Sequence, residues 1–135
     1  MHHKLAPENL RINPNYSQGI ETAPGMRIVA VAGQTGANKD GTVPDGIGAQ
    51  ADQAWANVMA VLAEAGMGAG HIIHYTSYLV AGTEQGPYDE ARLRHLGDAR
   101  PASTKIFISG LARPGMLCEV QAFAAAPAEL EEPVV

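Results

Sequence analysis

The residues that decide the fold run Arg100-Pro101-Ala102-Ser103-Thr104-Lys105 and lead through an apolar segment to Cys118-Glu119-Val120. A proline suits the first position of a β-strand, because the N–H that it lacks falls where pairing begins. The residues that follow predict two strands, over 105–111 and 116–124. The short loop 112–115 between them predicts that these strands form a hairpin. Polar side chains at the mouth of a buried strand are well placed to carry out chemistry.

The rest of the chain alternates strand and helix patterns. β-Branched residues predict strands over 27–32 and 71–81, and weak alternation predicts a short strand over 16–22. Apolar residues at three- and four-residue steps predict a helix over 48–65, and a second helix is predicted over 87–96. This order predicts an α+β fold in which two helices back one mixed β-sheet.

The ends of the chain are expected to lie outside this pattern. Residues 1–15 contain Pro7 and Pro14 and predict an irregular lead-in with one short edge strand. Residues 127–135 are rich in Ala, Glu and Pro and predict a frayed acidic tail. A chain of 135 residues can bury one core, so we expect a single domain over 1–135.

Charge and cysteine content limit the classes of partner. The formal net charge is -5, and Glu129, Glu131 and Glu132 near the C-terminus account for three acidic groups. The sequence has no stripe of basic residues that could follow a phosphate backbone, so we expect no nucleic-acid partner. The single cysteine, Cys118, fits a reducing compartment. No apolar run approaches 18 residues, which predicts no membrane partner and a cytoplasmic protein.

Two motifs resemble ligand sites but favour simpler explanations. His71 and His74 have H-x-x-H spacing, yet an odd offset on a strand directs them to opposite faces. We therefore expect no metal site there. The glycine-rich segment 66–70 follows a helix, whereas a phosphate loop precedes one, so a flexible connection is favoured.

Glu119 is a carboxylate between apolar residues of the last predicted strand. A carboxylate in that position lies at a sheet edge, at a subunit interface or in a pocket with a partner. A structural ion pair is the other interpretation, and Arg100 or Lys105 would be available for it.

Several short motifs, taken in order, resemble the Rid family (RidA, also called YjgF) of enamine and imine deaminases. They are Tyr16-Ser17-Gln18; Ala32-Gly33-Gln34; Gln50 through Asn57 to Ala65-Gly66; Arg100-Pro101-Ala102-Ser103-Thr104; and Leu117-Cys118-Glu119-Val120. The resemblance covers residues 16–124 and implies a chorismate-mutase-like α+β subunit. It also implies a homotrimer that binds a small molecule in clefts between subunits. Active members hydrolyse imines and enamines such as 2-aminoacrylate to ketoacids and ammonia, with no metal or cofactor.

The resemblance also implies a set of site residues. Glu119 matches the glutamate that positions the attacking water, with help from backbone groups near Gly33, and Tyr16 matches a tyrosine that closes the cleft. The candidate catalytic residue is therefore Glu119, and the candidate substrate-binding residues are Tyr16, Gly33, Gln34, Ser103, Lys105 and Cys118.

Ser103 stands where the family has an arginine that binds the substrate carboxylate. Loss of a charged, buried donor costs about 2–5 kcal/mol, so we expect the standard 2-aminoacrylate deaminase activity to be weak or absent. Lys105 lies on the same face of the strand, two residues on. One hypothesis is that its ammonium enters the cleft; the alternative is that it extends to solvent or pairs with Glu119 across the hairpin.

Two functions follow from these residues. The first is a hydrolase that acts on a small C=N or related metabolite, for which a neutral substrate would suit Ser103 better than an anion. The second is a non-catalytic trimer that binds a metabolite or a protein. Retention of Glu119, Tyr16 and Gly33-Gln34 favours the hydrolase, because a binding module has no obvious need for a carboxylate that orients water.

Overall fold

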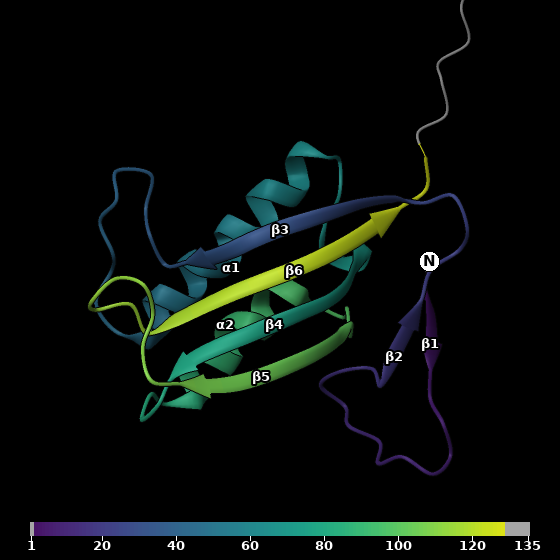
Figure 1. The fold of residues 1–135 in the computed structure, drawn as a ribbon, viewed down its shortest axis with the longest axis horizontal. Helices are drawn as coiled ribbons and strands as arrows, with labels where there is room; N and C mark the ends of the chain where they lie inside the picture. Colours follow the sequence, from purple (N-terminus) through teal and green to yellow (C-terminus); the bar gives the residue numbers. More distant parts are fainter. Residues whose placement is uncertain (1, 129–135) are drawn as a thin grey trace, which may run out of the picture.

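One mixed sheet forms the centre of the protein in a computed structural model that describes residues 2–128. Its strands are β3 (Arg27–Thr35), β4 (Ile72–Val80), β5 (Ala102–Ile108) and β6 (Cys118–Ala126), in the order β3-β6-β4-β5. The helices α1 (Ile47–Glu64) and α2 (Gln85–Leu96) both lie on one face of this sheet (Figure 1). The prediction of an α+β fold with two helices behind a mixed sheet is confirmed.

The strand order corrects the predicted hairpin. Within the main sheet β5 pairs with β4, in parallel, whereas β6 lies between β3 and β4 and runs antiparallel to both (Figure 1). The burial of the two strands explains this arrangement. Six of the nine residues of β6 are buried, but β5 has no buried residue. The more apolar strand takes the centre of the sheet and β5 takes the edge, and the segment between them, residues 109–117, is longer than the predicted loop over 112–115.

The core lies between the sheet and α1. The apolar stripe of α1 consists of Ala51, Ala54, Trp55, Val58 and Leu62, all fully buried. It packs against a row of small side chains on β6, where Val120, Ala122 and Ala124 are also fully buried. Alternate residues of a strand share a face, so this row fixes which side of β6 faces the helices.

The N-terminal residues form a separate two-stranded sheet. β1 (His3–Leu5) pairs antiparallel with β2 (Gly19–Glu21), and Figure 1 shows the pair beyond the N-terminal ends of β4 and β5. β1 corresponds to the short edge strand expected in the lead-in, and β2 occupies part of the predicted strand over 16–22. Most of the predicted acidic tail, residues 129–135, lies outside the described residues.

Small differences separate predicted and observed boundaries. The first predicted helix differs by one residue at each end, and the second begins two residues earlier than predicted, at Gln85. His71 belongs to the short 3-10 helix η1 (Ala69–His71) rather than to β4. Among residues 2–128, no helix has the length and apolar character that a membrane span requires.

Candidate functional site

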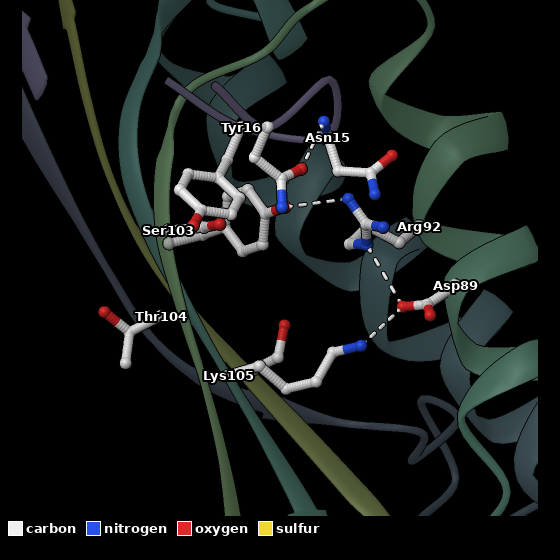
Figure 2. Close-up of a pocket in the computed structure, with 10 residues that line it drawn as sticks. Asn15, Tyr16, Asp89, Arg92, Ser103, Thr104 and Lys105 are labelled. Atoms are coloured by element: carbon white, nitrogen blue, oxygen red, sulfur yellow. Dashed lines mark hydrogen bonds and ion pairs between the residues drawn. The ribbon is translucent and has the colours of Figure 1, made fainter. Parts of the chain in front are cut away.

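A polar pocket of about 290 Å³ opens between β5 and α2 (Figure 2). This volume is at the small end of the range for ligand pockets, so it fits a small metabolite. Its lining residues are Asn13, Asn15, Tyr16, Tyr75, Ser77, Asp89, Arg92, Ser103, Thr104 and Lys105. The pocket therefore brings together three segments: the lead-in, the β4–β5 pair and α2.

Strand register explains why Ser103 and Lys105 face this pocket. In the parallel pairing of β4 with β5, Ser103 is opposite Tyr75 and Lys105 is opposite Ser77. Tyr75 and Ser77 are buried towards the helices, so their neighbours on β5 point to the same side. The prediction that Ser103 and Lys105 share a face is confirmed.

The ammonium of Lys105 is held by α2. Nζ donates to Asp89 Oδ1 at 2.8 Å and to Gln85 Oε1 at 3.1 Å. It also lies 5.7 Å from the centroid of the Tyr88 ring, within range of a cation–π contact. The alternative that Lys105 pairs with Glu119 is wrong, because the two residues belong to strands that are not neighbours. Lys105 contributes charge to the pocket, but Asp89 balances it.

Arg92 is a pocket residue that the sequence interpretation missed. Its side chain is only 7% exposed. Nη1 donates to the Tyr75 hydroxyl at 3.0 Å, and Nε lies 3.5 Å from Asp89 Oδ1. A signal was available, because Arg92 lies four residues after Tyr88 and four before Leu96 on the buried face of α2. A charged residue on an apolar helical stripe calls for a buried partner or a ligand.

Arg100 has a positioning role next to the pocket. Its guanidinium donates to the carbonyl oxygens of Pro14, Gly97 and Ala99 at 2.8–3.0 Å. It therefore holds the lead-in against the start of β5, which keeps Tyr16 at the pocket. An ion pair of Arg100 with Glu119, considered from the sequence, is not formed.

Glu119 and Gly33 meet on the other face of the sheet. The β3–β6 register shifts between Val31 and Gln34, and this bulge contains Gly33. A Cβ on Gly33 would lie 2.6 Å from Glu119 Oε1, so only glycine permits this close approach. Glu119 alternates with the core residues Cys118 and Val120, and it therefore points away from the helices.

Gln34 and Cys118 are two other predicted site residues, and neither of them lines the pocket. Cys118 precedes Glu119 in the sequence, and Gln34 lies on β3, the strand that pairs with β6. The Gln34 amide donates to the carbonyl oxygen of Ala32 at 3.1 Å. Cys118 is fully buried in the core, where burial raises the pKa of its thiol to about 12. Its position corrects the expectation of a direct contact between this thiol and a substrate, because the core residues around it close off access.

Two halves of the predicted site thus lie on opposite faces of one sheet. Tyr16, Ser103 and Lys105 line the pocket on the helix side, whereas Gly33 and Glu119 lie together on the open side. Within one chain, therefore, these two halves of the predicted site are not in contact.

The histidines do not form a metal site among the described residues. His71 Nδ1 accepts a hydrogen bond from the backbone N–H of Gly68 at 2.9 Å, within η1. Residues 2–128 contain no group of three or more His, Cys, Asp and Glu side chains placed to bind a metal ion.

Comparison with known families agrees with the fold and with the motifs. Residues 7–126 match the family described as endoribonuclease L-PSP. This match spans most of the chain, so the protein belongs to that family. Its structural neighbours include Rid and YjgF proteins. A search of curated proteins finds no match.

Solved structures with the same fold come from several bacteria. The Rid protein YyfB of Yersinia pestis, of unknown function, superimposes with a TM-score of 0.81 at 24% identity, covering 93% of this chain and 98% of its own. A Mycobacterium tuberculosis member of the YjgF/YER057c/UK114 family is 26% identical, with a TM-score of 0.65 and coverage of 82% and 86%. Escherichia coli TdcF, solved with bound serine, is 23% identical, with a TM-score of 0.69 and coverage of 86% and 91%.

Proposed function

We propose that the protein is a Rid-type hydrolase that acts on a small imine, enamine or related metabolite. Glu119 positions the attacking water, and no metal or cofactor takes part. Standard 2-aminoacrylate deamination is expected to be weak or absent because Ser103 replaces the arginine. The one cysteine, buried in the core, is compatible with action in the cytoplasm.

The observation that carries this proposal is the contact between Glu119 and Gly33. The bulge in β3 and the absence of a side chain at Gly33 leave room for the carboxylate directly against the backbone. A carboxylate next to backbone polar groups can accept a proton from water while those groups orient it. A carboxylate that served only solubility would need neither the bulge nor the glycine.

We further propose that the active site is composite. Because Glu119 and Ser103 lie on opposite faces of the sheet, one copy supplies the pocket and a second copy supplies Glu119. A homotrimer with clefts between adjacent subunits meets this requirement, since each interface joins two different surfaces in a closed ring.

Imine consumption downstream of a serine or threonine dehydratase tests the reaction. We expect Glu119→Gln to abolish whatever turnover the wild type shows, and Ser103→Arg to raise turnover of 2-aminoacrylate. Glu119→Gln turning over like wild type would refute the proposed role of Glu119.

Co-expression of two inactive variants tests the composite site. Glu119→Gln and Tyr16→Ala each damage one half of the cleft. With random assembly from equal amounts of the two variants, about a quarter of all clefts receive two intact halves, so about a quarter of the wild-type activity returns. Restoration fails entirely if each site is built from one chain.

The alternative is a non-catalytic trimer that binds a metabolite or a protein, and Ser103 favours it. TdcF binds serine, which makes small amino acids reasonable probes for either function. The binding module predicts ligand affinity that does not depend on Glu119, together with no turnover. The family description refers to an endoribonuclease; incubation with labelled RNA checks our expectation that nucleic acid is not the substrate.

A further inference from the structure

The Arg92 side chain is buried, and few of its hydrogen-bond donors have a partner. A guanidinium carries five N–H groups, yet among residues 2–128 Arg92 makes one hydrogen bond, from Nη1 to Tyr75. Its Nε is buried without a hydrogen-bond partner, since Asp89 Oδ1 lies at 3.5 Å without suitable geometry. Buried donors are nearly always satisfied, so the guanidinium has fewer acceptors than its burial requires.

The pocket can supply an acceptor to the opposite end of the guanidinium. Arg92 lines the same cavity as Ser103, and Figure 2 shows its guanidinium directed from α2 towards the space in front of β5. The end of the guanidinium formed by Nη1 and Nη2 can bind a carboxylate through two parallel hydrogen bonds. Nη1 uses one of its N–H groups on Tyr75, and Nη2 donates to none of residues 2–128.

The charge of the pocket points to the same ligand. Arg92 and Lys105 bring two positive charges, and Asp89 is the one acidic residue among those that line it. The same oxygen of Asp89 lies near both cations. One unit of positive charge therefore remains, which one carboxylate would balance. Ser103 by itself favours a neutral ligand, whereas the charge of the whole pocket favours an anion.

We propose that Arg92 is the carboxylate-binding residue of this pocket. It acts from α2, whereas the arginine that is absent at position 103 would act from β5, so the carboxylate lies at a different place from that of 2-aminoacrylate in the family's active members. The small side chain of Ser103 leaves the space through which a ligand reaches Arg92. The ligand class is a small monocarboxylate that carries a further polar group for Ser77, Ser103 or the asparagines of the lead-in. This inference rests on the proposed function in that it concerns the same pocket.

Direct binding tests Arg92 without any need for turnover. The probe is pyruvate, and pyruvamide is its neutral counterpart. Isothermal titration with wild-type protein is expected to show binding of pyruvate and at least tenfold weaker binding of pyruvamide. Arg92→Met should weaken pyruvate binding at least thirtyfold, the lower bound for loss of a buried charged donor. Arg92→Lys should recover part of the affinity, because it keeps the charge but loses the fork.

Arg94→Met is the matched control. Arg94 lies two positions after Arg92 on the same helix, but its side chain is 60% exposed and pairs with Asp52. Its replacement should leave pyruvate binding unchanged. Equal loss in Arg92→Met and Arg94→Met would show that net charge alone governs binding and would overturn the inference.

A measurement on wild-type protein covers the case in which Arg92→Met does not fold. In a ¹⁵N-resolved spectrum, pyruvate should shift the Nε–H resonance of Arg92, and pyruvamide should not. An unmoved resonance at saturating pyruvate, or equal binding of both probes, overturns the proposal.

The outcomes separate this inference from the proposed function. Binding of pyruvate that depends on Arg92, without turnover of any imine by wild type, supports Arg92 and refutes the hydrolase. Turnover that depends on Glu119 but is unchanged in Arg92→Met, both in KM and in kcat, supports the hydrolase and refutes the role of Arg92.

Discussion

Replacement of Gly33 by alanine tests whether the Glu119 carboxylate is held where water attack needs it. The new Cβ would meet Glu119 Oε1 at 2.6 Å and Cδ at 2.8 Å. An ordinary contact begins near 3.4 Å, so Oε1 must withdraw by roughly 0.8 Å, the difference between 3.4 and 2.6 Å. The obstacle is the end of a flexible side chain, which can rotate away.

The energetic cost should be small and the catalytic cost large. A side chain forced off its rotamer costs about 0.5–1.5 kcal/mol, and the alanine regains about 0.4–1 kcal/mol by restricting the unfolded chain. The free energy of unfolding should therefore change by about 1 kcal/mol or less. A displacement of nearly 1 Å at a reacting group can lower kcat about 100-fold.

Gly36→Ala is the matched control in the same segment. Its Cβ would lie 2.7 Å from the Cα and the carbonyl oxygen of Gln50, which are backbone atoms of α1. Gln50 is buried and tied to Gly115 and Leu117 by its side-chain amide, so it cannot rotate away. This variant should lose about 1–3 kcal/mol, as overpacked sites do.

Urea denaturation measures both free energies, and the dehydratase-coupled assay measures turnover. We expect Gly36→Ala to be the less stable variant and Gly33→Ala to be the less active one per folded molecule. Gly33→Ala with wild-type turnover would refute the argument that the Gly33 contact positions Glu119. Greater destabilisation in Gly33→Ala than in Gly36→Ala would refute the geometric reasoning itself.

Three further predictions concern a buried thiol, an exposed ion pair and a buried hydrogen bond. Burial raises the pKa of Cys118 to about 12, so a thiol reagent such as DTNB should label it only after unfolding; rapid labelling of the native protein at pH 8 would contradict its burial. The hydrogen bond from His95 lowers the pKa of Asp52, so its stabilisation is present above about pH 4 and is lost as the pH falls through the lowered value. Because Asp52 is half exposed, Asp52→Asn should cost a few tenths of a kcal/mol at pH 7 and progressively less as the pH falls below about 4. A difference that stays constant with pH would be inconsistent with the pair. Ser77 and Tyr88 share a buried hydrogen bond, so Tyr88→Phe should lower the free energy of unfolding by about 1–3 kcal/mol. Adding Ser77→Ala should restore part of that loss, whereas simple additivity of the two changes would show that the bond is not the cause.

Local patterns predicted the elements well because they depend on short spacings. The stripe that includes Trp55, Val58 and Leu62 predicts α1 to within a residue, since a three- to four-residue period requires only the helix itself. Ser103 and Lys105 share a face for the same reason, because alternation along a strand is a local property.

Strand order was not predictable in the same way. The short loop predicted over 112–115 favours a hairpin between β5 and β6, but pairing partners are chosen by burial over the whole sheet. β6 carries the alanine-rich face that fits against α1, so it is inserted between β3 and β4.

The sequence by itself determined that this is an α+β chain with the Rid motifs, with Glu119 on a strand and without an arginine at position 103. Only the tertiary structure decided how those residues are grouped. It separated Glu119 from Ser103 by the thickness of the sheet, buried Cys118 in the core and brought Arg92 from α2 to the pocket. The physical reason is that motifs report neighbours along the chain, whereas a binding site is a set of neighbours in space, which sheet order and helix packing establish.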